Sequence, residues 1–438
     1  MKITLCSSLL SLSLGLLLAC AKPPVFHGSD KAKPSQENPQ SDDLEDETSD
    51  DPIKDDSVIV EGKGEGSTTQ QKPPVDPVAT AKDISAAALK SLEALLLKNP
   101  SALTDINKES FAKAALTSED AAKVRTRLWD EWKKRELAAR QSEIKDFVVK
   151  AAGQTMRYKT KIFGNKPAKG RSLYVSLHGG GQTAASVNDE QWNNQIDLYQ
   201  PSEGLYLAPR APTDTWDLWQ MAHIDALLDR LISSYILTGE VDPDRVYFMG
   251  YSAGGDGLYQ LGPRMADRLA AASMSAGHPG DASPIGLRNI GFAIHCGGDD
   301  SAYDRNKLAG EWGRTLDNLE KGESGSYKHQ VNVVAGKGHW MDLVDAESVP
   351  WMGGFTRNPF PKKIAWHQDD VNHNRFYWVS VDTPKTGTEL TAEIKDQTIT
   401  IKDDMPGVLR IRLNEDMIDF AKDIKVLRNG KETYTFDG

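Results

Sequence analysis

Residues 245–254 read Arg245-Val-Tyr-Phe-Met-Gly-Tyr-Ser-Ala-Gly254, an apolar run that ends in the pentapeptide G-x-S-x-G. The run is typical of a buried β-strand, and the residues after it can form a helix. A serine on a tight turn between a strand and a helix projects its hydroxyl from the edge of a sheet, and the flanking glycines let the backbone adopt that turn. Ser252 is therefore a candidate nucleophile.

A glycine run lies upstream of the serine, at the end of another apolar segment. The segment Leu173-Tyr-Val-Ser-Leu177 is followed by His178-Gly-Gly-Gly181. Glycines let backbone N–H groups approach a reacting oxygen closely, and the residue after the nucleophile, Ala253, would supply a further N–H group. We therefore expect an oxyanion hole built from Ala253 and from Gly180 or Gly181.

A serine hydroxyl is a weak nucleophile at neutral pH, so Ser252 needs a base within hydrogen-bond reach and an acid that orients the base. Among the histidines that follow the serine, His339 alone combines a glycine-rich approach, Gly336-Lys-Gly-His339, with a strand-like segment before it, residues 330–335. Catalytic residues of α/β sheets lie on loops of this kind. His339 is therefore the candidate base.

The chain around these motifs alternates strand-like and helical segments. From about residue 147 the strand-like segments are short and apolar, and they include 156–163, 173–177, 205–208, 245–249 and 292–295. Strands that alternate with helices specify a mainly parallel sheet with helices on both faces. The sequence thus predicts an α/β fold with a doubly wound sheet over residues 147–365.

The serine turn, the upstream His-Gly-Gly-Gly loop and the order serine, acid, histidine together resemble the α/β-hydrolase superfamily. Over residues 150–345 the chain is similar to secreted esterases of the polyhydroxybutyrate depolymerase and feruloyl or acetylxylan esterase kind. The resemblance implies an α/β-hydrolase fold and a serine carboxylic ester hydrolase, with Ser252 as nucleophile and His339 as base. It implies no cofactor.

The acid of the triad is expected after the strand-like segment 292–296, where Asp299 and Asp300 are neighbours. Only one of them can accept a hydrogen bond from the imidazole. Many members of the superfamily place the acid three residues after a glycine that ends a strand, and Gly297 at that offset makes Asp300 the preferred acid. If Cys296 takes the place of the glycine, the acid is Asp299, and the sequence leaves that alternative open.

The first residues resemble a bacterial lipoprotein signal peptide. Lys2 precedes an apolar run that ends in Leu17-Leu-Ala-Cys20. Residues 1–19 are therefore predicted to be removed and Cys20 to carry the lipid, with an ordinary secretory signal as the alternative. This prediction places the protein in the cell envelope, anchored by lipid to a bacterial membrane and facing the periplasm or the cell exterior.

Three other segments complete the predicted organisation. Residues 20–81 are rich in Pro, Ser, Asp and Glu and carry too little apolar surface to fold, which predicts a disordered acidic tether. Residues 82–146 show apolar side chains at helical spacing, which predicts a helical extension that packs onto the enzyme or supports its lid. Residues 366–438 alternate with a period of two between turn signals and predict a small, all-β, sandwich-like domain.

Composition narrows the function classes. The 438 residues, 39% hydrophobic and 26% charged, allow a large buried core. The net charge of −11 argues against a nucleic-acid partner, because phosphate affinity requires clustered Lys and Arg. The sequence has no H-E-x-x-H motif, and Cys296 is the one cysteine left after the signal peptide and the lipidated Cys20, so we expect neither a metal site nor a disulfide. We expect a monomer.

Loop residues are candidates for the substrate pocket, namely Trp216, His278 and Trp340. Loop aromatics suit flat or sugar-like groups, although they serve equally well as loop anchors. The leading hypothesis is a lipid-anchored serine esterase acting on a small-molecule or polymeric ester. The alternatives are a serine peptidase of the same fold and a noncatalytic surface-binding lipoprotein on a hydrolase scaffold.

Overall fold

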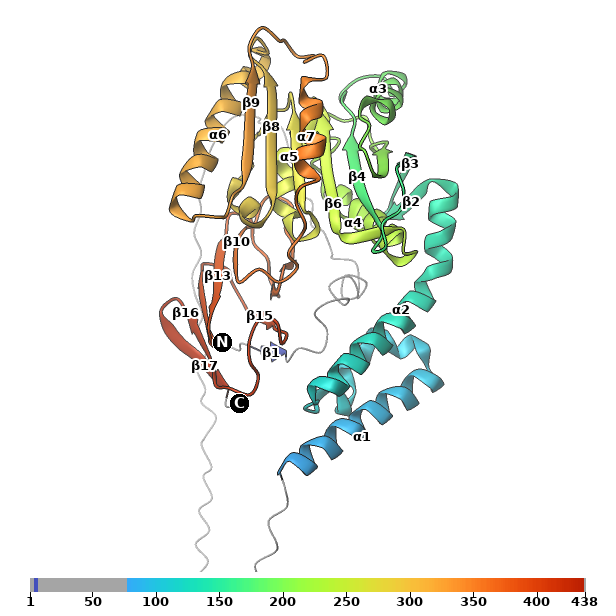
Figure 1. Cartoon of the computed structure of the whole chain (residues 1–438), viewed down its shortest axis with the longest axis vertical. Helices are drawn as coiled ribbons and strands as arrows, with labels where there is room; N and C mark the ends of the chain where they lie inside the picture. Colours follow the sequence, from blue (N-terminus) through green and yellow to red (C-terminus); the bar gives the residue numbers. More distant parts are fainter. Residues whose placement is uncertain (1–3, 7–76, 437–438) are drawn as a thin grey trace, which may run out of the picture.

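The computed structural model describes residues 4–6 and 77–436 and contains three parts (Figure 1). We call residues 77–146 the helical extension, residues 147–357 the α/β unit and residues 363–436 the β unit. The predicted signal peptide and acidic tether lie almost wholly outside the described residues, as does Cys20.

The α/β unit is built on an eight-stranded sheet with the order β2-β3-β5-β4-β6-β7-β8-β9. In chain order the strands are β2 (Val148–Ala151), β3 (Gln154–Phe163), β4 (Arg171–Leu177), β5 (Gly204–Pro209), β6 (Val241–Tyr251), β7 (Ala271–Ser275), β8 (Gly291–Gly297) and β9 (His329–Val334). The β2–β3 and β3–β5 pairs are antiparallel, and the other pairs are parallel.

Helices cover both faces of this sheet, which is why its central strands are apolar along their whole length. They are α3 (Ala185–Leu198), α4 (Ala222–Leu237), α5 (Ala253–Arg264), α6 (Arg305–Gly322) and α7 (Ser348–Met352). Alternate residues of β4 face different helices: Leu173 and Val175 join the apolar cluster of α4, α5 and α6, whereas Tyr174 joins that of α3 and α7. The predicted α/β fold, with a doubly wound and mainly parallel sheet, is confirmed.

The helical extension consists of α1 (Pro77–Lys98), two 3-10 helices (Pro100–Lys108 and Ser110–Lys113) and α2 (Ser118–Asp146). Helices α1 and α2 share a small apolar cluster formed by Leu92, Leu96, Val124 and Leu128. The end of α2 is tied to α4, because the Glu143 carboxylate accepts hydrogen bonds from Arg230 at 2.7 Å and from Ser234 at 3.2 Å.

The helical extension lies away from the loop that follows β9, which passes over the opposite end of the sheet (Figure 1). The extension packs against α4 and the first strands of the sheet, where the Tyr158 hydroxyl donates to the Glu143 carbonyl at 3.1 Å. Support of a lid stays a prediction.

The β unit contains two sheets, one of which also includes a short strand from outside residues 363–436, β1. One has the order β10-β13-β14-β16-β17, and the other has the order β1-β15-β12-β11. Their strands are β1 (Thr4–Cys6), β10 (Lys363–His367), β11 (Arg375–Phe376), β12 (Val379–Val381), β13 (Glu389–Lys395), β14 (Thr398–Asp403), β15 (Leu409–Arg412), β16 (Ile424–Arg428) and β17 (Lys431–Phe436). Strand β10 begins before residue 366, so the β unit starts a few residues earlier than predicted.

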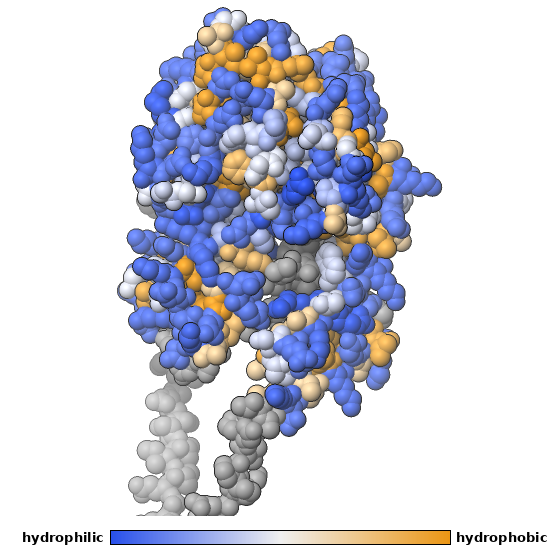
Figure 2. All heavy atoms as spheres, in the orientation of Figure 1, coloured by the Kyte–Doolittle hydropathy of each residue, from blue (hydrophilic) through white to orange (hydrophobic). Residues whose placement is uncertain are grey.

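The β unit shares one continuous apolar cluster with α4 and α5, and its Tyr377 hydroxyl donates to the Ala266 carbonyl at 3.1 Å. A unit this small would be marginal by itself, and docking supplies the buried surface that it lacks. The visible face of the molecule is largely hydrophilic, with apolar residues in separate patches (Figure 2). Within the described ranges, no helix has the length and apolar character needed to cross a membrane.

Candidate active site

Ser252 occupies a sharp turn between β6 and α5. Its backbone angles are φ 58° and ψ −121°, a conformation that L-residues rarely adopt. The flanking glycines are required by close contacts: a Cβ on Gly250 would lie 2.4 Å from the Gly254 carbonyl oxygen, and one on Gly254 would lie 2.2 Å from that of Leu177. Gly250 is thus explained by the close approach of the two arms of the turn, and Gly254 by packing of the turn against the end of β4. The turn exposes the serine at the carboxyl edge of the sheet.

His339 lies beside this serine. Its Nε2 is 2.9 Å from Ser252 Oγ, and its Nδ1 is 2.8 Å from Asp300 Oδ2. With the Nδ1 proton donated to the carboxylate, Nε2 is left to accept the hydroxyl proton. The three side chains come from the ends of β6, β8 and β9, and the structure brings them together as the sequence predicted.

The two candidate acids have different surroundings. The Asp300 side chain is 2% exposed and also has the Arg305 guanidinium 3.6 Å away. Asp299 is exposed, and its backbone N–H donates to the Lys337 carbonyl at 2.8 Å. Asp300 is therefore the aspartate that contacts the imidazole, and the alternative acid, Asp299, instead helps to tie the acid loop to the loop of His339.

The His-Gly-Gly-Gly loop is held by His178. This ring is completely buried, contacts the Gly179 carbonyl through Nδ1 at 2.6 Å and accepts the Ala211 N–H on Nε2 at 3.1 Å. Burial lowers the pKa of His178 to about 4. The imidazole consequently stays neutral near pH 7, as its acceptor role at Nε2 requires.

The oxyanion-hole prediction needs one correction. The Gly181 N–H donates to Asn188 Oδ1 at 2.9 Å, and Asn188 in turn donates to Asp214 at 2.7 Å, so the prediction of Gly181 as an oxyanion donor is wrong in this conformation. Gly180 lies at the cavity beside the serine with φ 105°. Ala253 is the first residue of α5, where N–H groups have no partner within the helix. Gly180 and Ala253 thus remain the candidate donors.

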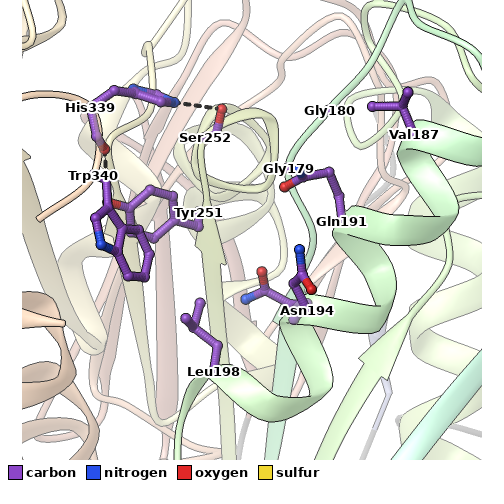
Figure 3. Close-up of a pocket in the computed structure, with 11 residues that line it drawn as sticks. Gly179, Gly180, Val187, Gln191, Asn194, Leu198, Tyr251, Ser252, His339 and Trp340 are labelled. Carbon is purple, nitrogen blue, oxygen red and sulfur yellow. Dashed lines mark hydrogen bonds between the residues drawn. The ribbon is translucent and has the colours of Figure 1, made fainter. Parts of the chain in front are cut away.

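A cavity of about 510 Å³ opens beside Ser252 (Figure 3). One wall is a face of α3, whose side chains recur at helical spacing, and the other walls come from the glycine loop, the serine turn and the His339 loop. The lining residues are Gly179, Gly180, Val187, Gln191, Asn194, Gln195, Leu198, Tyr251, Ser252, His339 and Trp340. Apart from the imidazole of His339, every lining side chain is an uncharged polar, aromatic or apolar group.

Of the three predicted lining residues, Trp340 contacts the cavity and the other two lie outside it. Trp340 lines the cavity and is 49% exposed. Trp216 lies outside it and packs against Tyr303, with ring centroids 6.0 Å apart. His278 also lies outside the cavity, where its backbone N–H donates to the Asp256 carboxylate at 2.6 Å. The structure therefore does not bring Trp216 and His278 into the cavity lining.

Sequence analysis indicated the segment 188–192 of α3 as one that could shape the pocket, but it missed the rest of the α3 wall and Tyr251. Helical spacing of Gln191, Asn194 and Leu198 after the glycine loop could have indicated a wall, but polar residues at such spacing usually mark a solvated face. Cys296 is buried on β8, and burial raises its pKa to about 12, so it stays an unreactive thiol. In the portion of the chain that the structure describes, no group of three or more His, Cys, Asp or Glu could hold a metal ion.

No family model matches the chain, and no curated protein matches it. Several solved structures do. They include a ferulic acid esterase (16% identity, 47% of this chain and 94% of that chain, TM-score 0.32), a poly(3-hydroxybutyrate) depolymerase from Bordetella parapertussis (15%, 47% and 86%, TM-score 0.34) and Thermogutta terrifontis esterase 2 (16%, 46% and 89%, TM-score 0.34). With TM-scores of 0.32 to 0.34 these likenesses carry no argument, and the function must be argued from the site. By its strand order and its serine turn the chain has the α/β-hydrolase fold, and the solved structures similar to it include esterases and a depolymerase.

Proposed function

We propose that the protein is a serine hydrolase that cleaves carboxylic esters through an acyl-enzyme on Ser252. The observation that carries the proposal is the pair of contacts made by one imidazole, 2.9 Å to Ser252 Oγ and 2.8 Å to Asp300, at the mouth of a cavity. A nucleophile, a base and an orienting acid in this geometry are what acyl transfer requires.

The reaction follows from these positions. Ser252 Oγ attacks the ester carbonyl carbon while His339 Nε2 takes the hydroxyl proton, and Asp300 stabilises the imidazolium that forms. The carbonyl oxygen becomes an oxyanion, which the N–H groups of Ala253 and Gly180 stabilise. Collapse of the intermediate expels the alcohol, which receives its proton from His339. Water then attacks the acyl-enzyme with His339 as base again, which releases the acid and restores Ser252.

The cavity favours an uncharged substrate group. Its lining combines the amides of Gln191 and Asn194 with the apolar side chains of Val187 and Leu198 and the indole of Trp340. An ionised group would lose its hydration here without gaining a counter-ion, whereas a neutral oxygen-bearing group finds hydrogen-bond partners and an apolar wall. The lining also offers no carboxylate to receive the amino end of a peptide, which favours ester over peptide cleavage.

The proposed location is the cell envelope, with the chain held to a bacterial membrane through a lipid on Cys20. The support is the Leu17-Leu-Ala-Cys20 sequence behind an apolar run. Cys20→Ala should move the protein from the membrane fraction to the soluble fraction of cells that express it. Membrane retention of this variant, after high-salt washing that removes peripheral proteins, would contradict the lipid anchor.

The catalytic proposal is tested with a fluorophosphonate probe, whose phosphorus atom a nucleophilic serine attacks with loss of fluoride. The folded wild-type protein should be labelled at Ser252, and Ser252→Ala should not be labelled. Hydrolysis of p-nitrophenyl acyl esters is then compared with that of aminoacyl and peptidyl p-nitroanilides. Faster cleavage of the anilides would indicate a peptidase, and folded protein that neither takes the probe nor hydrolyses any ester would indicate a noncatalytic scaffold.

A further inference from the structure

Tyr251 is the last residue of β6 and the immediate neighbour of the proposed nucleophile. Its ring is 7% exposed and contributes to the cavity that Ser252 faces (Figure 3). It packs in a small apolar cluster with Ala276 and Met341, against which Leu198 of α3 also lies. The side chain therefore touches the pocket wall, while its backbone continues into the serine turn.

The Tyr251 hydroxyl makes two hydrogen bonds to the loop that carries the proposed base. It donates to the His339 carbonyl at 2.8 Å and accepts the Met341 N–H at 3.0 Å. A single hydroxyl thus uses both its donor and its acceptor capacity on backbone groups on either side of Trp340. Burial raises the pKa of this phenol well above its ordinary value, so the donor proton is retained throughout the neutral range.

The loop needs such an anchor because little in its sequence fixes its shape. It contains Gly336 and Gly338, and Asp342 and Leu343 both adopt positive φ angles of 52° and 64°. On the side of the acid, the loop is tied by the hydrogen bond from Asp299 to Lys337. On the side of the nucleophile, the Tyr251 hydroxyl supplies the tie, and the ring meets the His339 imidazole at its edge, with centroids 6.1 Å apart and planes at 80°.

We propose that Tyr251 is a positioning residue that fixes the His339 imidazole relative to Ser252 through its hydroxyl. The inference rests on the proposed function. Tyr251 and Ser252 are consecutive at the end of β6. The same end of this strand therefore carries the nucleophile and, through the Tyr251 hydroxyl, holds the backbone of the base. A misplacement of about 1 Å between such groups can lower a rate by about 100-fold.

The test is Tyr251→Phe, assayed in the full chain with p-nitrophenyl acetate. The variant keeps the ring in the cavity and removes the hydroxyl. We expect kcat to fall by about 10- to 100-fold while KM changes by less than about twofold, because the bound substrate touches the ring and not the hydroxyl. Rates are normalised to the number of sites that the fluorophosphonate labels, so that partial unfolding does not count as lost catalysis.

The matched control is Tyr247→Phe. Tyr247 lies on the same strand, is completely buried, and its hydroxyl donates to the Phe355 carbonyl at 2.8 Å, away from the His339 loop. Tyr251→Phe loses two hydrogen bonds and Tyr247→Phe loses one, but only Tyr251→Phe should lose kcat.

Ser252→Ala separates the two proposals. If Ser252→Ala keeps its activity, the proposed function fails. If Ser252→Ala is inactive and Tyr251→Phe has the same kcat per labelled site as Tyr247→Phe, the proposed function stands and the positioning role of Tyr251 is overturned. A change of KM alone in Tyr251→Phe would also overturn it, since that result assigns the hydroxyl to substrate binding.

Discussion

Two aspartate–histidine pairs in the described part of the chain have the same contact distance, although one uses Nδ1 of its histidine and the other uses Nε2. At the carboxyl edge of the sheet, Asp300 and His339 are 2.8 Å apart. Where the α/β unit meets the β unit, Asp225 of α4 and His373 are also 2.8 Å apart. Distance alone therefore does not distinguish a general base from a structural contact.

The other partners of each pair make the difference. The His339 ring turns its second nitrogen to Ser252 at a cavity, and its side chain is 45% exposed. Asp225 is instead held by Arg264, which donates to both carboxylate oxygens at 2.7 Å from α5. The second pair thus completes a buried ion network that joins two helices to the β unit, whereas the first leaves a nitrogen free to move a proton.

The largest effect that separates the pairs is expected from Asp300→Asn. An amide in place of the carboxylate disturbs the tautomer of His339 and no longer stabilises the imidazolium, so kcat should fall by about 10³- to 10⁴-fold with little change in thermal stability. Asp299→Asn, next to it in the chain and exposed, should keep near-wild-type kcat. Steady-state kinetics and thermal unfolding of both variants are the measurements, and near-wild-type activity of Asp300→Asn would remove Asp300 from the triad.

The opposite pattern is expected from Asp225→Ala. Removing this carboxylate leaves the Arg264 guanidinium buried without its counter-ion, which should lower the free energy of unfolding by about 3–5 kcal/mol. The kcat per labelled site should not change. Urea unfolding measures the loss, and Asp197→Ala, which breaks an exposed pair with Lys161, is the control with an expected loss of about 0–1 kcal/mol. An Asp225→Ala variant as stable as the control would show that the buried network does not join the units.

The two pairs also differ in how far they could be predicted from the sequence. The Ser252 turn, the Asp299-Asp300 pair and His339 each follow a recognisable strand, and parallel strands bring their carboxyl ends to one edge. Local patterns were therefore enough to predict that these groups meet, although they left Asp299 open as the acid. Asp225 and His373 are 148 positions apart and lie in no motif, and their contact depends on how the β unit docks. Local patterns contain no information on such docking.

The dependence on tertiary contacts also explains two details of the site that the sequence did not predict. Glycine spacing alone could not tell Gly180 from Gly181, because the Gly181 N–H is taken by the Asn188 side chain from the following helix. The Tyr251 hydroxyl also escapes prediction, since the variable position of G-x-S-x-G accepts many residue types. In both cases the partner of a polar group is a tertiary contact, and sequence periodicity does not report it.

A pH dependence of stability sharpens the comparison further. Burial alone would raise the pKa of Asp225, but attraction by Arg264 and the hydrogen bond from His373 outweigh it, and the pKa falls from 3.8 to about 2. Because the folded pKa lies below the unfolded value, the stabilisation is fully present above about pH 4 and is lost as the pH falls towards 2, with a size of about 2 kcal/mol. Urea unfolding between pH 5 and pH 2 should therefore show that the free energy of unfolding falls less for Asp225→Asn than for the wild type. If the free energy of unfolding fell equally with pH in both proteins, the pKa of Asp225 would not be lowered in the folded state.

The smallest effect is expected from His373→Ala. Asp225 keeps both hydrogen bonds to Arg264, so its charge stays compensated and the loss should be about 1 kcal/mol, that of a single hydrogen bond. His339→Ala, the same substitution in the other pair, should abolish ester hydrolysis and leave urea unfolding nearly unchanged. A double-mutant cycle of His373→Ala with Asp225→Asn isolates the contact between the two side chains, because the other interactions of each residue cancel. A coupling energy close to zero would show that His373 only fills space at the junction, whereas a coupling near 1 kcal/mol would establish the Asp225–His373 contact as a structural link between α4 and the β unit.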